Sequence, residues 1–269
     1  MFAGGLEMVR VQPAVVAGMF YPADPEQLRS DIKVYLEQAE GKAPAPPKAL
    51  IAPHAGYIYS GPVAGNAYAQ LATQCDSIRL VVILAPAHRV AFSGIAYAGA
   101  TAFRTPLGDV EVDLEALSSV TGLPQLQHRD DAFRNEHSIE VHLPFLQETL
   151  SSFKIVPLLV GDATPTEVDE VLESLWGGSE TLILISSDLS HYLGYDAARR
   201  MDQEATRAIE SMNPDALSYH HACGRIPVSG LLLAARRHHL KVNTLDLRNS
   251  GDTAGPHDRV VGYGAYALC

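Results

Sequence analysis

The sequence predicts a single α/β domain over residues 1–269, built on a central, mostly parallel or mixed sheet with helices on both faces. Apolar runs of strand length alternate along the chain with helical patterns, which is typical of β-α-β units. Several of these runs are continuously apolar, as expected for strands that are buried on both faces of a sheet. No long low-complexity segment divides the chain, and its length is within the range of one α/β domain.

The expected elements follow from this alternation. Asp24 is a suitable N-cap for a first helix, with Pro25 at its first position. Small residues predict a second helix over 62–73, and Pro144 is expected to kink a helix over 137–150. The other predicted helices span 164–175, 195–211 and 227–238, and residues 94–113 are expected to form an antiparallel excursion. The predicted strands span 48–53, 79–86, 154–160, 181–188, 241–248 and 259–268.

Composition excludes several classes of protein. The formal charge of 20 − 31 = −11 and the lack of a Lys/Arg cluster argue against nucleic-acid binding, because neutralisation of phosphates drives that affinity. No apolar run approaches the roughly 20 residues that a membrane helix needs. Three scattered cysteines argue against a disulfide scaffold and suit a reducing cytoplasm. Motifs for dinucleotides, for the P-loop and for the nucleophile elbow of hydrolases are absent from the sequence.

Polar residues follow four of the predicted strands. His54 follows the strand at 48–53 and His88 follows the strand at 79–86, each after an Ala-Pro approach. The segment 187–191, Ser-Asp-Leu-Ser-His, follows a third strand, and 249–252, Asn-Ser-Gly-Asp, follows a fourth. Ligands of open parallel sheets bind outside the carboxyl ends of the strands, so we expect these groups to share one pocket.

His54 and His88 predict a metal site, because two neutral imidazoles at neighbouring strand ends are a common start of one. Taken alone, His54 could equally be a histidine that bonds only to backbone, but His88, with the same Ala-Pro approach, favours the metal site. The third ligand is open between Asp188 and Cys223. Cys223 precedes a predicted helix and is close to Arg225, which would favour a thiolate, whereas the alternative is an inert buried thiol.

Asp188 and His191 form an Asp-x-x-His pair that predicts proton transfer, in which the carboxylate orients the imidazole. The competing interpretation is that Ser187 or Asp188 caps the following helix. His137 is a candidate residue of the pocket, and His142 is expected to be structural.

Seven stretches of the sequence together resemble the Memo family, which includes the AmmeMemoRadiSam system protein B type. They keep their order and span most of the chain. They are AGMFYPADPEQL (17–28), APHAGYIYSGPVAG (52–65), LAPAH (84–88), FRTPLGDVEVD (103–113), EHSIEVHLPFLQ (136–147), SSDLSHY (186–192) and CGRIPV (223–228).

The resemblance implies a fold similar to that of class III extradiol ring-cleavage dioxygenases. It implies metal ligands at His54, His88 and Cys223, with Asp188 and His191 beside the metal. The third ligand in those dioxygenases is a carboxylate, so a thiolate here departs from their chemistry. Two imidazoles and a thiolate are compatible with Fe(II), Cu or Zn.

Three functions are consistent with these residues. The first is a mononuclear Fe(II)- or Cu-dependent redox enzyme that acts on a small molecule. The second is non-enzymatic: metal handling, or binding of a peptide or of a radical-SAM partner protein, as the family resemblance implies, in a groove lined by Tyr57, Tyr59 and Tyr192. The third is a zinc-dependent hydrolase with His191 as the base.

Overall fold

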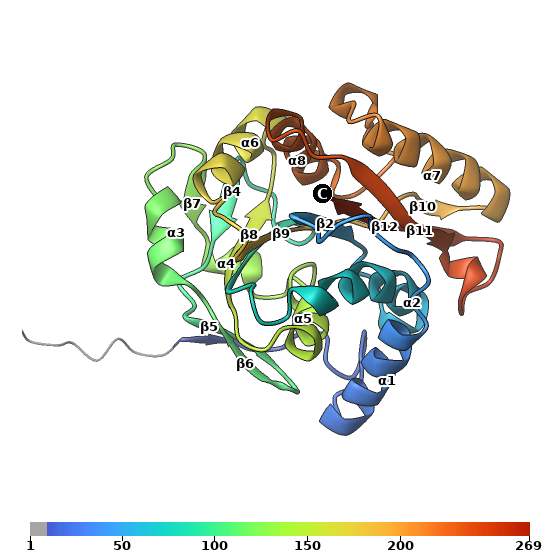
Figure 1. The fold of residues 1–269 in the computed structure, drawn as a ribbon, viewed down its shortest axis with the longest axis horizontal. Coiled ribbons are helices and arrows are strands. Elements are labelled where there is room, and N and C mark those ends of the chain that lie inside the picture. Colours follow the sequence, from blue (N-terminus) through green and yellow to red (C-terminus); the bar gives the residue numbers. More distant parts are fainter. Residues whose placement is uncertain (1–9) are drawn as a thin grey trace, which may run out of the picture.

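The computed structural model describes residues 10–269 and confirms the α/β class. Figure 1 shows a central twisted sheet between two groups of helices. From one edge, the strands of this sheet are β10 (His191–Leu193), β12 (Val260–Leu268), β2 (Ala49–Ala52), β9 (Thr181–Ser186), β3 (Leu80–Pro86), β8 (Lys154–Val160), β4 (Ile95–Tyr97) and β7 (Leu126–His128), and β11 (Val242–Asn249) also pairs with β12.

The middle of the sheet is parallel, and its outer parts are mixed. Strands β2, β9, β3 and β8 run parallel, whereas β12 is antiparallel to β2, and β4 is antiparallel to β8. Every residue of β2 and β9 is buried, as is nearly all of β3 and β8. The continuously apolar runs in the sequence therefore form the strands that helices cover on both faces.

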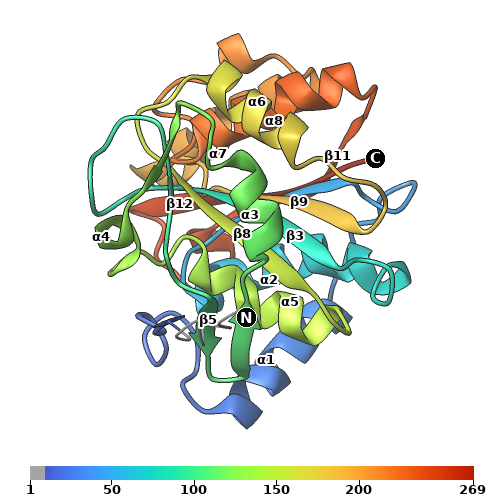
Figure 2. The ribbon, with the colours of Figure 1, turned by 90° about the vertical axis from the view of Figure 1, so that its left-hand side faces the viewer.

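Helices pack on both faces of the sheet, as the two views show (Figures 1 and 2). One group contains α1 (Pro25–Glu37), α2 (Tyr57–Tyr68) and α5 (Leu143–Thr149), which contact one another. The other group contains α6 (Pro165–Ser174), α7 (Tyr195–Glu210) and α8 (Arg225–Arg237), and α6 packs against α8. Two further helices are α3 (Leu114–Val120) and α4 (Asp130–Phe133).

Residues 94–113, predicted as an antiparallel excursion, divide between two sheets. β4 belongs to the central sheet, and the strands that follow it belong to a second, small sheet. Its strands are β1 (Val11–Gln12), β5 (Ala102–Thr105) and β6 (Gly108–Glu111). β5 and β6 are antiparallel, as predicted, but β5 also pairs in parallel with β1, a strand from the distant N-terminal part. No helix within residues 10–269 is long and apolar enough to cross a membrane.

Local sequence signals located some helix ends and missed others. Asp24 caps α1 as predicted: its carboxylate accepts from the Gln27 backbone N–H, and Pro25 begins the helix. The prediction of a helix over 62–73 was wrong at its start, because α2 begins at Tyr57 and Pro62 lies inside it. Residues 69–73 form a separate 3-10 turn.

The predicted helix over 137–150 was also wrong in its first half. Residues 140–142 form a 3-10 turn, and α5 begins only at Leu143, so Pro144 lies in its first turn. Proline is well tolerated there because the first backbone N–H groups of a helix have no intrahelical acceptor, and it produces no kink. Ser187 and Asp188 cap no helix either, since α7 begins at Tyr195 after Gly194.

Candidate metal centre

The predicted convergence at one edge of the sheet is present. His54 follows β2, His88 follows β3, and Asp188 follows β9, which lies between those two strands. Strand β11 ends at the same edge, because it is antiparallel to β12 and β12 is antiparallel to β2. Ser250, directly after β11, lines the same cavity as the two histidines and Asp188.

Three potential ligand atoms meet in this cavity. One atom each of His54, His88 and Cys223 lies within 4.8 Å of the other two. The Cys223 Sγ is 3.5 Å from the His54 Nε2. Cys223 lies in the turn just before α8. The third donor therefore comes from this turn and not from the end of β9. Of the two candidates that the sequence left open, the thiol is the one in this cluster.

A chain of hydrogen bonds determines the tautomer of His54. The Ser186 hydroxyl donates to the Ser138 backbone carbonyl at 2.7 Å, so its oxygen is free to accept from His54 Nδ1–H at 2.6 Å. The proton of a neutral His54 therefore lies on Nδ1. Its Nε2 carries a lone pair that faces Cys223, which is the form that binds a metal ion.

Glu136 determines the tautomer of His88 in the same way. One carboxylate oxygen lies 3.1 Å from His88 Nδ1 and also accepts from the backbone N–H groups of His137 and Ser138. The other oxygen accepts from the His88 backbone N–H at 2.6 Å. Burial opposes ionisation, but the hydrogen bonds and charge of His88 hold the pKa of Glu136 down, at about 2. The side chain of Glu136 is 2% exposed, and its acceptor capacity is taken, so we assign it to positioning His88.

The Cys223 thiol is neutral in the metal-free chain. Burial and the nearby charge of Asp188 raise the pKa of the thiol well above its usual range. Arg225 does not offset these effects, so the predicted thiolate does not arise from its neighbours along the chain. A cation bound beside Sγ would favour the thiolate directly.

Asp188 contacts His54 rather than His191. Its Oδ1 accepts from the His54 backbone N–H at 2.8 Å, and its Oδ2 is 3.9 Å from the His54 Nε2. Burial raises the pKa of Asp188 to about 7, so the carboxyl can change protonation near neutral pH. Within residues 10–269, no hydrogen bond joins Asp188 to His191, although both line the cavity. Their joint role in proton transfer stays a prediction.

Two further imidazoles are close to the cluster. The His137 ring stacks on the His88 ring, with centroids 5.3 Å apart, and lies 5.6 Å from the His54 ring. Burial lowers the pKa of His137 to about 4, and burial also lowers the pKa of His191. Both rings are therefore neutral bases at pH 7. The Nδ1 of His137 is buried without a hydrogen-bond partner, and it lies 3.4 Å from the Glu136 Oε1.

The cavity that holds these groups has a volume of about 580 Å³. Tyr59 and Tyr192 line it, as the hypothesis of a tyrosine-lined groove expected. Tyr57 does not, and that part of the prediction was wrong. Its ring is buried in the core, and its hydroxyl donates to the Val141 carbonyl at 2.6 Å. An α-helical start at Tyr57 turns this ring toward α5, where it packs on Phe145.

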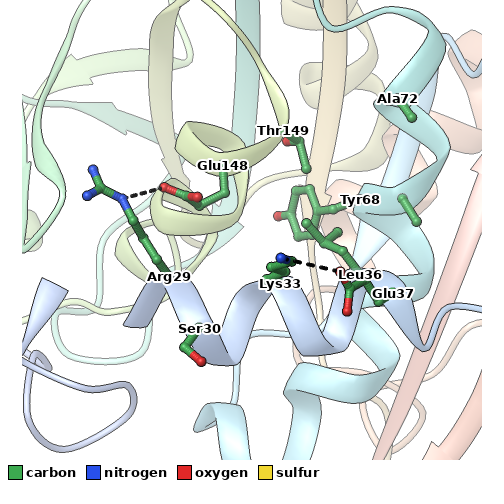
Figure 3. A pocket seen from close by; sticks show the side chains of 10 residues that line it. Arg29, Ser30, Lys33, Leu36, Glu37, Tyr68, Ala72, Glu148 and Thr149 are labelled. Atoms are coloured by element: carbon green, nitrogen blue, oxygen red, sulfur yellow. Dashed lines mark hydrogen bonds and ion pairs between the residues drawn. The ribbon is translucent and has the colours of Figure 1, made fainter. Parts of the chain in front are cut away.

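A larger groove, of about 830 Å³, lies between α1, α2 and α5 (Figure 3). Its charged side chains neutralise one another: Arg29 pairs with Glu148 at 3.1 Å, and Lys33 with Glu37 at 3.7 Å. None of the candidate metal ligands lines it. We therefore place the functional site in the smaller cavity, where the potential ligands and the titratable groups meet.

The donor set fits a transition-metal ion. Two imidazoles with their Nε2 lone pairs free and one thiol are borderline to soft donors, and hydrogen bonds hold both rings in place. Three protein donors leave coordination positions open, as in catalytic rather than purely structural metal sites. Sequence reasoning identified the three donors but not Ser186, Ser138 or Glu136, whose roles depend on contacts between distant segments.

Comparison with known proteins agrees with the earlier resemblance. The family model described as "Memo-like protein" matches residues 12–267. MEMO1 family proteins of Aquifex aeolicus and Sulfolobus acidocaldarius are each 35% identical to the chain, over 95% of it and 98% of their own length. One from Metallosphaera sedula is 34% identical, over 94% of the chain and 96% of its own length. The chain belongs to the Memo-like protein family.

Proposed function

We propose that this protein binds one transition-metal ion through His54, His88 and Cys223 and uses it in a redox reaction on a small molecule. The observation that carries the proposal is the meeting of three donor atoms, within 4.8 Å of one another, at the ends of separate segments. If these donors met only by chance, buried hydrogen-bond acceptors that hold both imidazoles in the metal-binding tautomer would not be expected beside them.

Fe(II) or Cu is the proposed metal, because a thiolate with two imidazoles is a soft set that supports electron transfer. Such an ion would supply open positions for a substrate or O₂ and a change of oxidation state. The chain's own contribution is to orient the donors and to move protons. His191 and His137 are neutral bases that line the cavity with the cluster, and burial raises the pKa of Asp188 to about 7. The free thiol of Cys223 is suited to the reducing cytoplasm that we propose as the location.

A second candidate is a non-enzymatic role in metal handling or in binding a peptide or a radical-SAM partner. It is favoured by exposed apolar side chains at the opening of the cavity: Met19 is 73% exposed, Ile58 62% and Tyr192 63%. Exposed apolar groups around a pocket are typical of interaction sites. Both candidates use the buried groups that hold the imidazoles, but only the redox reaction also uses His137, His191 and Asp188 as groups that move protons.

The test begins with anaerobic purification and elemental analysis of the full chain. We expect close to one Fe or Cu per chain, lost in His54→Ala and Cys223→Ser. The matched control His220→Ala changes an exposed histidine outside the cluster and should keep the metal. Oxygen consumption is then measured with catechols and thiols.

Metal well below one per chain in the wild type, or metal that persists in His54→Ala, contradicts the proposal. Stoichiometric metal without any oxygen consumption would favour the non-enzymatic role. Turnover of esters or amides with zinc but not with iron would instead support the hydrolase.

A further inference from the structure

Two arginines at the opening of the metal cavity form no ion pair with any residue of the described range 10–269. Arg89 directly follows His88, and Arg259 directly precedes β12, and both are exposed. Neither is among the arginines of the described chain that form ion pairs. Those arginines are Arg10, Arg29, Arg104, Arg129, Arg237 and Arg248.

These two positive charges lie on a protein of opposite net charge. The chain carries a net charge of −11, so an anion that approaches it is repelled on average. In the groove of Figure 3, each cation has a carboxylate beside it, whereas the opening of the metal cavity offers free guanidinium groups. The positive charge of Arg89 extends to His137, where it contributes to lowering the pKa of that imidazole. An anion that enters the cavity would therefore meet positive charge before it reaches the donors.

Aromatic surface lies beside these charges. The Arg259 guanidinium carbon is 5.1 Å from the centroid of the Tyr192 ring, and Tyr59 and Tyr263 line the same cavity. Tyr192 has a φ of 59°, which is a strained conformation for a bulky residue. Strain of this kind persists where the surrounding structure holds it. Tyr192 is 63% exposed and lies at the opening of the cavity.

We infer that the cavity binds a small aromatic carboxylate, with the carboxylate on Arg89 and Arg259 and the ring against Tyr192. The planar fork of a guanidinium matches a carboxylate through two parallel hydrogen bonds, and an aromatic face adds contact area for a planar ring. The cavity of about 580 Å³ is large enough for a ligand of this size. This inference rests on the proposed function in one respect: it assumes that the ring extends from the arginines toward the His54, His88 and Cys223 cluster.

The test uses three probes that differ in their polar group: benzoate, its neutral analogue benzamide, and phenyl phosphate. Their dissociation constants are measured by ligand-observed NMR on the metal-free and the zinc-loaded full chain. We expect benzoate to bind at least tenfold more tightly than benzamide. The double variant R89Q/R259Q should weaken benzoate tenfold or more and leave benzamide unchanged, because charge-assisted hydrogen bonds to a carboxylate are lost. The control Arg200→Gln removes an exposed positive charge on α7 and should leave benzoate binding unchanged.

Equal affinity for benzoate and benzamide overturns the inference, and so does an equal loss in Arg200→Gln. Phenyl phosphate that binds tenfold more tightly than benzoate overturns the assignment to a carboxylate. Elemental analysis of the wild-type chain separates the two proposals. Bound metal in a wild-type chain that does not discriminate between benzoate and benzamide refutes the inference alone, whereas arginine-dependent benzoate binding in a wild-type chain that takes up no metal refutes the proposed function alone.

Discussion

Glu136→Gln is the sharpest test of how the site is held, because it keeps the size of the side chain and removes its charge. The carboxylate accepts four hydrogen bonds, from the His88 ring and from the backbone N–H groups of His88, His137 and Ser138. A glutamine offers only one oxygen, so its amide NH₂ must face at least one of these donors. A buried donor left without an acceptor costs about 1–3 kcal/mol of stability.

The larger expected effect is on metal binding. Glu136→Gln leaves the His88 Nδ1–H at best a neutral amide oxygen in place of a carboxylate, and mutation of such a partner typically lowers metal affinity about 10- to 100-fold. Affinity is measured by competition with a chromophoric chelator, and stability by urea denaturation. The control Glu115→Gln changes an exposed acid in α3 and should have neither effect. Metal affinity of Glu136→Gln within twofold of the wild type would refute the assigned role.

Three further substitutions test neighbouring parts of the account. Ser186→Ala removes the acceptor of His54 Nδ1–H and should lower metal affinity about tenfold; chelator competition that shows no change would refute the tautomer argument. Tyr57→Phe removes a buried hydrogen bond and should cost about 1 kcal/mol in urea denaturation with unchanged metal content, so altered ligand binding would contradict its structural role. Burial raises the pKa of Asp202 to about 6, so the folded chain holds this proton more tightly than the unfolded chain does. The resulting stability is fully present below about pH 4 and is lost as the pH rises through about 6. In Asp202→Asn, the free energy of unfolding should therefore change less between about pH 4 and about pH 6 than in the wild type. An equal change in both proteins would contradict the raised pKa of Asp202.

The sequence was informative where the chemistry is local. Continuous apolar runs identified the buried parallel strands, and the residues just after them, His54 and His88, meet as predicted because parallel strands end at one edge. Asp24 and Pro25 marked the start of α1, since capping depends on the next three residues only. The choice of Cys223 over Asp188 as the third ligand required the family resemblance, because the spacing of Cys223 from the histidines along the chain carries no signal.

Contacts between distant segments were not predictable in this way. Glu136 bonds to His88 across 48 positions, and Ser186 to His54 across 132. The local pattern predicted a helix around Glu140, but residues 140–142 form a 3-10 turn. The Glu140 carboxylate accepts from the backbone N–H groups of Val15 and Val16, which are far away along the chain. Tertiary contacts override helical propensity in such a segment.

The central claim is that His54, His88 and Cys223 bind one metal ion together. X-ray absorption at the metal edge of the zinc-loaded chain tests it most directly, because sulfur and nitrogen ligands give separate distances. We predict one sulfur at about 2.3 Å with two imidazole nitrogens at about 2.0–2.1 Å, and loss of the sulfur shell in Cys223→Ser. A shell of nitrogen and oxygen alone in the wild type would contradict it.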